Sequence, residues 1–481
     1  MAQLDLMILL PALAAAIAVV AGRLNARMPK WVALAAVIAQ LVLLASLSRH
    51  GVWAGNRILG LDGTATKGVW QTAIDGLSMP LVALTVFIGL VAVVASWHIT
   101  ERPGTYFALI LALQAAVTGV FLAESLLLFY IAWECVLVPM YFLIGGWGSS
   151  NRKHAATKFL IYTFAAGTLM LVGLIFTLVQ EGGGTSISGL IAGRAAITAP
   201  SVVFWLFTIG FLVKLPAVPF HTWLPDAHTE APTAGSIILA GVMLKMGGYG
   251  LLRIALPFAP SAFEASRGLL AALGIIGIVY GAAMAFVQTD LKRLVAFSSV
   301  SHMGFVVLAI SVGTPAALAA AMLAMVSHGF VAGLLFLLVG ALYERTHTRE
   351  LGRLGGLGKV VPLWGTAFMF AALASLGLPG LSGFPGEFVT VLGSFSAFGW
   401  WTAIATIGLV LGAAYNLRAV RGSVQGPVGE FDVLADLNVR ELGLGTAFVA
   451  GIVLIGVQPH LVVRGAETAL TVVSRLVNGG A

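Results

Sequence analysis

The strongest constraint on this chain is its series of long apolar stretches. A helix needs roughly 20 mostly apolar residues to cross a bilayer, and the sequence predicts fourteen such spans. The 481 residues are 59% hydrophobic and only 9% charged, whereas soluble domains carry about 25% charged residues. We therefore expect an all-α polytopic membrane protein of about 14 transmembrane helices. The predicted cores are 4–22, 31–48, 76–97, 104–123, 125–146, 156–179, 201–218, 234–256, 268–288, 291–311, 315–343, 363–394, 399–420 and 443–463.

Positive charge predicts the orientation of these spans. Residues 4–22 lack a preceding basic segment, so we interpret them as a first span and not as a cleaved signal peptide. With the N-terminus outside, inner loops hold fifteen of the 26 Lys and Arg residues and outer segments hold eight. Because inner loops of membrane proteins are enriched in Lys and Arg, both termini are predicted outside. The net charge of +7 then needs no nucleic-acid partner.

Two predicted spans are broken by proline. The seventh reads FLVKLPAVPFHTWLP, with Pro216 and Pro219, and the twelfth reads LGLPGLSGFPGEF, with Pro379 and Pro385. Proline removes a backbone donor, and paired interruptions are typical of inverted repeats around a transport site. We predict two inverted five-helix repeats, each containing a broken helix. The predicted segments are 1–100, a first repeat at 101–257, a second repeat at 265–420, and 421–481.

Ionisable residues occupy equivalent helices of the two repeats. Glu134 in span five precedes Lys214 in span seven by 80 residues, and His302 in span ten precedes Glu387 in span twelve by 85. A charge at mid-bilayer costs roughly 2.5–3.5 kcal/mol on insertion scales, so these side chains should face the protein interior. Glu134 is the natural counter-ion of Lys214. The alternative is a fixed ion pair that only joins two helices.

Further candidates lie near the centres of spans eight to eleven. Lys245 is too central to snorkel and is expected to relay protons between the repeats. His302 and His328 can both donate and accept hydrogen bonds, which suits a proton wire, although a buried histidine can also be structural. Ser298 and Ser299 share a helix face with His302.

Other charged residues fall near span ends. Glu387 is expected to carry protons at the exit or to cap the half-helix that follows Pro385. Lys158 is either snorkelled to the interface or a modulator of the path. The segment HTWLPDAHTEAPT is either a plain connection or an inner-side proton inlet; its candidates are His221, Asp226, His228 and Glu230. We expect Asp290 and Lys292 to pair at the surface.

The residues argue against several other kinds of site. Cys135 is the only cysteine, so an internal disulfide and a cysteine-ligated metal or iron–sulfur site are excluded. No HxxxH or HExxH spacing suggests a metal site, and no glycine-rich nucleotide-binding motif stands in the necessary context. We expect no metal and no cofactor in this chain.

Several segments resemble the antiporter-like proton-translocating membrane subunits of bacterial NADH:quinone oxidoreductase, respiratory complex I. They are FYIAWECVLVPMYFLIGGWG, KFLIYTFAAG, VKLPAVPFHTWLPDAHTEAPTAGSIILAGVMLKMGGYGLLR, SSVSHMGF and GLPGLSGFPGEF. The resemblance covers roughly residues 75–420, and the long segment 213–253 is the most specific. The glutamate in span twelve resembles the M type within this family, because the L and N types more often have lysine there.

The resemblance implies a proton path and a set of partners. Glu134 would pair with Lys214, Lys245 would be the central lysine, His302 and His328 would connect, and Glu387 would be the terminal acid. Flavin, iron–sulfur clusters and the quinone site would lie in other subunits. The chain would sit among membrane lipid between subunits L and N, in the bacterial cytoplasmic membrane.

Three other functions compete with this one. A chain of a multisubunit cation/proton antiporter is the first alternative, and Glu387 in place of lysine argues against it. A membrane subunit of a hydrogenase or ferredoxin-linked complex is the second. A purely structural scaffold is disfavoured, because it would not need so many central ionisable residues.

Overall fold

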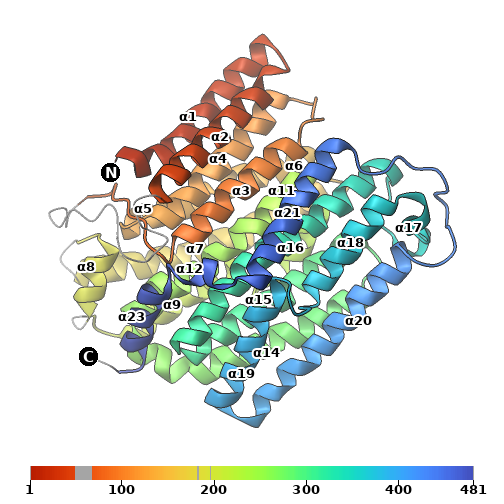
Figure 1. The fold of residues 1–481 in the computed structure, drawn as a ribbon. Helices are drawn as coiled ribbons and strands as arrows, with labels where there is room; N and C mark the ends of the chain where they lie inside the picture. Colours follow the sequence, from red (N-terminus) through yellow and green to blue (C-terminus); the bar gives the residue numbers. More distant parts are fainter. Residues whose placement is uncertain (1, 49–67, 181–183, 195–196, 480–481) are drawn as a thin grey trace.

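The computed structural model describes residues 2–48, 68–180, 184–194 and 197–479 as a bundle of packed helices (Figure 1). Three of the eight Lys and Arg residues counted in the predicted outer segments, Arg49, Arg57 and Lys67, lie outside the described residues. The red helices α1 and α2 and the blue helix α20 lie at opposite edges of the bundle, and the helices of the two broken spans lie between them.

Helices up to the middle of the chain are α1 (Ala2–Leu24), α2 (Met28–Ser48), α3 (Met79–Ala95), α4 (Pro103–Leu122), α5 (Leu126–Cys135), α6 (Leu137–Trp147), α7 (Arg152–Gln180), α8 (Ile187–Ala192), α9 (Pro200–Lys214), α10 (Trp223–Glu230) and α11 (Thr233–Ile238). They are followed by η3 (Leu239–Met243), α12 (Leu244–Gly250), η4 (Leu251–Ala255), α13 (Leu256–Phe258), α14 (Pro260–Val287), α15 (Leu291–Val312), α16 (Pro315–Thr346), η5 (Leu351–Arg353), α17 (Leu357–Val360), α18 (Pro362–Ser375), α19 (Gly383–Phe398), η6 (Trp400–Ile404), α20 (Ala405–Ser423), α21 (Val439–Val457), α22 (His460–Val463) and α23 (Glu467–Val477).

The predicted spans have counterparts in these helices. Within the described residues, 11 helical segments are long and apolar enough to cross a membrane. Three shorter apolar helices, Met79–Ala95, Pro200–Lys214 and Pro362–Ser375, stand where the sequence predicts the third, seventh and twelfth spans. The all-α multi-span prediction is therefore confirmed.

Both proline-marked spans are broken as predicted. α9 ends at Lys214 and α10 begins at Trp223, while α18 ends at Ser375 and α19 begins at Gly383. At the first break the Trp223 Nε1–H donates to the Val213 carbonyl over 3.0 Å, which satisfies an acceptor freed by the interruption. The second break contains Gly377 and Gly380 at φ of 79° and 90°, a backbone region that glycine adopts without strain.

Span eight contains an irregularity that the sequence pattern did not reveal. The π-helices η3 and η4 flank the short helix α12, which carries Lys245. A π turn offsets the regular hydrogen-bond ladder and is frequent at functional sites. Here it leaves the Ala240 carbonyl to accept a hydrogen bond from the Lys245 ammonium group. This span is therefore adapted around its lysine.

Close helix contacts depend on glycine. A Cβ atom at Gly274 of α14 would lie 2.7 Å from the Leu308 nitrogen of α15, and one at Gly304 would lie 2.6 Å from the Ile278 nitrogen. Such distances leave no room for a side chain. Small residues allow helix backbones to approach in membranes, where no hydrophobic drive pushes helices together.

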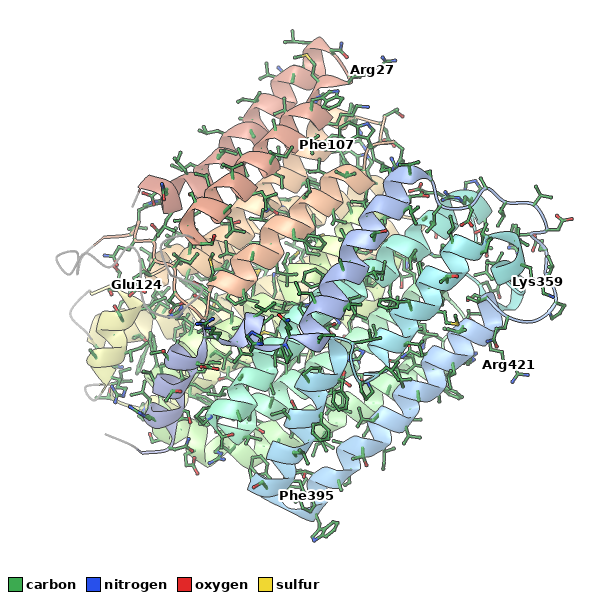
Figure 2. The ribbon with its side chains drawn as sticks, in the orientation of Figure 1. Arg27, Phe107, Glu124, Lys359, Phe395 and Arg421 are labelled. Atoms are coloured by element: carbon green, nitrogen blue, oxygen red, sulfur yellow. The ribbon has the colours of Figure 1, made fainter. Side chains whose placement is uncertain are left out.

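The two ends of the bundle differ in charge. Figure 2 shows Arg27, Lys359 and Arg421 along one end, which we call the basic end, and Glu124 and Phe395 toward the other. The three basic residues all belong to predicted inner loops. The first broken span runs toward the basic end. Its second half, α10, ends at Glu230, whose carbonyl accepts a hydrogen bond from the backbone N–H of Ser149, in the predicted inner loop after α6. The second runs away from it, from Lys359 before α18 toward Phe395 in α19. The two broken spans thus point in opposite directions, as an inverted repeat requires.

At the opposite end, Asp75 ties the loop before α3 to span eight. Its carboxylate accepts hydrogen bonds from the backbone N–H groups of Leu77 and Ser78 and lies 2.6 Å from the Arg253 guanidinium. Burial acts to raise the pKa of Asp75, but attraction and hydrogen bonding to Arg253 and Ser78 outweigh it and hold that pKa below the usual value. The carboxylate is thus stabilised in the folded protein.

Asp75→Asn should destabilise the fold by about 3 kcal/mol, because it leaves the largely buried Arg253 charge without its partner. The pKa of Asp75 is lower in the folded protein than in the unfolded chain, where it is about 3.9. Its carboxylate therefore stabilises the fold fully above that unfolded pKa, and this stabilisation is lost as the pH falls through the folded pKa. The difference in thermal midpoint between wild type and variant should therefore narrow below about pH 4. Tryptophan fluorescence of the detergent-solubilised proteins, recorded during heating at each pH, measures the thermal midpoints.

The matched control is Glu430→Gln, which breaks the exposed pair with Arg353 (2.6 Å). Exposed pairs contribute little, so the midpoint of this variant should stay at the wild-type value. Equal shifts in the two variants would contradict the argument.

Candidate functional site

Lys245 and His328 form the centre of the candidate site. Both are buried, with exposed fractions of 0% and 5%. The Lys245 Nζ lies 2.7 Å from His328 Nδ1 and also donates to the Ala240 carbonyl. When the ammonium donates to Nδ1, the ring proton is on Nε2. The imidazole then links Lys245 to the small cavity that His328 lines.

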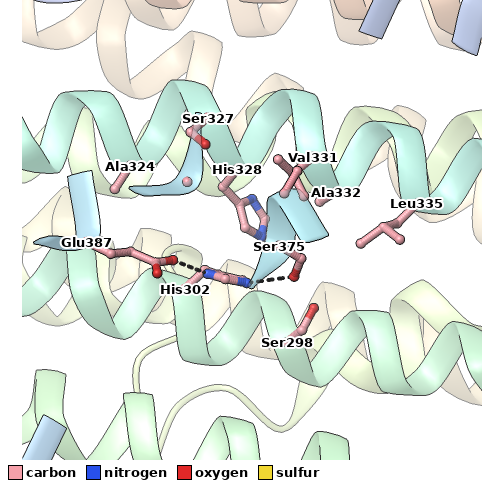
Figure 3. A pocket seen from close by; sticks show the side chains of 12 residues that line it. Ser298, His302, Ala324, Ser327, His328, Val331, Ala332, Leu335, Ser375 and Glu387 are labelled. Carbon is pink, nitrogen blue, oxygen red and sulfur yellow. Dashed lines mark hydrogen bonds and ion pairs between the residues drawn. The ribbon is translucent and has the colours of Figure 1, made fainter. Parts of the chain in front are cut away.

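A small cavity lies beside His328 and His302 (Figure 3). Its volume is about 20 Å³, and its lining includes Ser298, Ser327 and Glu387. The ring centroids of His302 and His328 are 5.7 Å apart, and the His328 Nε2 has no hydrogen-bond partner within the described part of the chain. A polar cavity of this size has room for one water molecule. One water would join the two imidazoles.

His302 is held between an acid and a hydroxyl. Its Nδ1 lies 2.8 Å from Glu387 Oε1, and its Nε2 lies 3.2 Å from the Ser375 hydroxyl. When Glu387 is ionised, Nδ1–H donates to it and Nε2 accepts from Ser375. When Nε2 takes up a proton, the imidazolium can pass the other proton to Glu387. The geometry therefore suits transfer along the ring.

Several polar residues around His302 were not predicted from the sequence. The Tyr415 hydroxyl lies 3.5 Å from His302 Nε2, and Asn416 Nδ2 donates to the Ser375 hydroxyl over 3.4 Å. Both residues come from α20. A polar Tyr–Asn pair inside the apolar span GAAYNLR was the available signal. These side chains orient Ser375 and His302 from a third helix.

Glu134 and Lys214 lie near each other but form no ion pair within 4.0 Å in the described chain. The Lys214 Nζ lies 5.4 Å from the ring centre of Trp133 and 5.7 Å from that of Phe159, where aromatic faces attract a cation. The two charges nevertheless interact through space. The alternative of a fixed ion pair between these two helices is therefore not what the structure shows; the attraction between Glu134 and Lys214 acts over a longer range.

Among the residues that the structure describes, no hydrogen bond holds the Oε1 atom of Glu134. The residue is half-buried. The side chain lies over Gly167 of α7, where a Cβ atom would collide with the carboxylate. Since no hydrogen bond from a described residue holds Oε1, a nearby change of charge can act on this carboxylate without breaking one.

In the predicted inlet segment, Asp226 forms ion pairs, whereas His221 and His228 pack against aromatic rings. Asp226 binds Lys158 at 2.6 Å and Arg293 at 3.1 Å, so Lys158 is paired with α10 and is not free at the interface. His221 lies edge-on to Tyr280, with ring centroids 5.0 Å apart. His228 stacks on Phe336 at 4.5 Å.

The two serines before His302 differ in position. Ser298 lines the small cavity. Ser299 donates to the Val295 carbonyl over 3.2 Å and is not among the lining residues.

The expected surface pair between Asp290 and Lys292 does not form, so this prediction is wrong. Asp290 instead binds Arg349 at 3.1 Å, whereas Lys292 is buried, with an exposed fraction of 6%, and donates to the Ala231 carbonyl. The bend between α14 and α15 turns the lysine inward. Sequence spacing alone placed both residues on one surface.

The described residues contain no group of three or more His, Cys, Asp and Glu side chains that could hold a metal ion.

The chain is similar to known proteins in both sequence and fold. Residues 123–412 match the family described as NADH:quinone oxidoreductase/Mrp antiporter, transmembrane region. The chain is 40% identical to NADH-quinone oxidoreductase subunit M of Pseudomonas aeruginosa, over 94% of each chain. It is similar to a chain of respiratory complex I from Thermus thermophilus, with a TM-score of 0.90 and 29% identity over 98% of this chain and 99% of that one. A chain of the Mrp complex from Dietzia sp. shares the fold, with a TM-score of 0.85 and 20% identity over 98% and 99%.

His328→Leu should lower the free energy of unfolding by about 1–3 kcal/mol, because the Lys245 amine loses one of its two partners while still buried. Thermal unfolding in detergent measures the shift. His154→Leu is the matched control, because His154 is exposed on α7; it should leave the midpoint unchanged. An unshifted midpoint in His328→Leu would show that the contact to Lys245 adds nothing to stability.

Proposed function

The chain belongs to the NADH:quinone oxidoreductase/Mrp antiporter family, and on that premise we propose that it is the proton-translocating membrane-arm subunit of a bacterial NADH:quinone oxidoreductase. The observation that carries this proposal is the line of ionisable residues from Lys245 through His328 and His302 to Glu387, in which only the step between the two imidazoles, whose centroids are 5.7 Å apart, lacks a direct hydrogen bond. An intramembrane line of ionisable groups is costly and is explained by proton transfer along it.

The second repeat would conduct protons as a wire. The Lys245 ammonium passes a proton to His328 Nδ1, and the proton on Nε2 leaves toward the small cavity. Water there carries it to His302 Nε2, and the proton on Nδ1 moves to Glu387 over 2.8 Å. Each ring gains a proton on one nitrogen and loses one from the other. Glu387 then releases the proton toward the end opposite the basic end.

The first repeat would control the wire by charge. The Glu134 carboxylate attracts the Lys214 ammonium without contact, so a charge arriving beside Glu134 changes that attraction. Two unit charges 4 Å apart interact by about 4 kcal/mol at an effective dielectric constant of 20. Moving one proton across 100 mV costs about 2.3 kcal/mol. The interaction energy from one change of charge near a relay residue is therefore large enough to drive one proton across the membrane.

The redox chemistry would belong to other subunits. Flavin, iron–sulfur clusters and the quinone site would lie in partner chains of the complex. Neighbours related to subunits L and N would cover lateral faces, together with lipid. Exposed apolar side chains beside Glu134, namely Ile131, Val138 and Phe142, are suited to such contacts. The basic end would face the cytoplasm, with both termini on the other side of the cytoplasmic membrane.

The cation/proton antiporter function is less well supported. Among the solved structures, the identity to the Mrp chain is 20% and that to the complex I chain is 29%. At the end of the proton line, Glu387 stands where lysine is more frequent in antiporter subunits. Membranes that contain this chain with antiporter partners should show no sodium-driven proton movement.

Lys214→Ala and Glu134→Ala should each abolish most NADH-driven proton uptake by inside-out membrane vesicles, while the complex still assembles. Either change removes one of the two interacting charges. A fluorescent pH probe measures uptake, and native gels measure assembly. Lys359→Ala and Glu430→Ala, which change exposed residues of the same types, are the controls. Wild-type uptake in both site variants would refute the assigned role.

Glu387→Gln should also abolish most uptake, because the amide can still hydrogen-bond His302 but cannot take up a proton. Glu387→Asp should retain part of the activity, since the carboxylate is kept but its reach to His302 is shortened. The ratio of protons taken up to NADH oxidised is the measurement. Equal ratios in the Gln variant and the wild type would remove Glu387 from the path.

A further inference from the structure

The Lys214 ammonium group lies between two aromatic rings, which we call the aromatic cage. Its Nζ is 5.4 Å from the ring centre of Trp133 and 5.7 Å from that of Phe159. Lys214 is 1% exposed, and its Nζ has no hydrogen-bond partner among the described residues. Burying a charge without a hydrogen bond is costly. The attraction of a cation to the ring faces offsets part of this cost.

The Trp133 ring is fixed in its place. It is buried, stacks on Phe129 of the preceding turn of α5 with ring centroids 5.7 Å apart, and meets Phe211 of α9 edge-on at 5.5 Å. Phe211 in turn lies against α12, because a Cβ atom at Gly250 would lie 2.5 Å from its ring. The indole therefore cannot turn away from Lys214 without displacing neighbouring helices.

The second ring of the cage is held by the first break. Phe159 of α7 is fully buried, and its ring centroid lies 5.5 Å from that of Trp223. Trp223 begins α10, and its indole N–H donates to the carbonyl of Val213, the residue before Lys214. The cage is thus built from α5 and α7 around the last turn of α9.

The choice of tryptophan at position 133 calls for an explanation. The Trp133 indole N–H is buried and has no hydrogen-bond partner within the described ranges, and an unpaired buried donor lowers stability. Phenylalanine would fill the place without this cost. The indole face, however, attracts a cation more strongly than any other aromatic side chain. The ring face toward Lys214 therefore accounts for the residue.

The cage and Glu134 attract the ammonium in different directions. Trp133 and Glu134 are adjacent in α5, so their side chains leave the helix about 100° apart. Trp133 is 1% exposed and points into the protein, whereas Glu134 is half-buried and lies over Gly167 of α7. The Lys214 ammonium lies with the rings, and no ion pair joins it to Glu134 in the described chain.

We propose that Trp133 is a positioning residue, which holds the Lys214 ammonium against its ring face and so prevents a closed ion pair with Glu134. The inference rests on the proposed function, and it adds the element that keeps the first repeat responsive. Coulomb attraction rises as two charges approach, so a closed pair would resist an arriving charge, whereas a separated pair responds to it. A cation–π contact in a desolvated site shifts such a balance by about tenfold or more.

The test uses vesicles that contain the whole complex, with NADH as electron donor. Trp133→Leu removes the ring face and should lower the protons taken up per NADH oxidised by about half or more, because Lys214 then pairs with Glu134. Trp133→Phe keeps a ring in place and should restore most of the wild-type ratio. Native gels measure assembly of each variant.

The matched control is Phe207→Leu. Phe207 is a fully buried ring of α9 that stacks on Phe211 at 6.1 Å, so its loss disturbs the same aromatic cluster but leaves both rings of the cage. This variant should keep the wild-type proton ratio, although its thermal midpoint should fall. Equal losses of uptake in Trp133→Leu and Phe207→Leu would show that both rings act only through packing.

A second experiment separates attraction from shape. Site-specific replacement of Trp133 by tryptophans with an increasing number of fluorine atoms draws electron density from the ring face and changes the shape of the side chain little. The proton ratio should fall stepwise along this series. A ratio that stays constant would overturn the proposal, because the ring would then act by its volume alone.

A third measurement does not depend on activity. In a structure of the complex with Trp133→Leu, the Lys214 Nζ should lie within about 4 Å of a Glu134 carboxylate oxygen, as in an ion pair. An ammonium that stays as far from Glu134 as in the wild type would contradict the positioning role.

The outcomes separate the two proposals. If Trp133→Leu matches wild type in proton ratio while Lys214→Ala is inactive, the role of the cage is wrong and the proposed function stands. If Lys214→Ala and Glu134→Ala also match wild type, control by the first repeat falls and the role of the cage falls with it.

Discussion

The structure depends on one constraint, which is that a buried ammonium group in a membrane protein must find its partners within the protein. Lys245 is fully buried, and two acceptors meet it, the Ala240 carbonyl and His328 Nδ1. The first is available because span eight changes to π-helix just before the lysine. The second comes from α16. Backbone irregularity and helix packing thus both serve a single side chain.

The two repeats use their ionisable residues differently. In the second repeat His302, Glu387 and Ser375 are joined by hydrogen bonds of 2.8 and 3.2 Å. In the first, Glu134 and Lys214 interact only through space, with Lys214 over the rings of Trp133 and Phe159. Hydrogen bonds suit proton transfer, which needs contact. A long-range attraction suits control, because it responds to a distant charge without a change in bonding.

Hydropathy, proline positions and isolated charges determined much from the sequence alone. They predicted the all-α bundle, the two breaks, and the placement of Glu134, Lys214, Lys245, His302 and Glu387 inside spans, because the cost of burying a charge in lipid applies to each span separately. Each of these signals describes one segment of the chain. They therefore could not show which side chains of different segments contact one another. Only the tertiary structure turned Lys292 inward, separated Glu134 from Lys214, and brought Tyr415 and Asn416 from α20 to His302. Those outcomes depend on helix rotation and close packing between segments distant in the chain, and local periodicity contains no information about either.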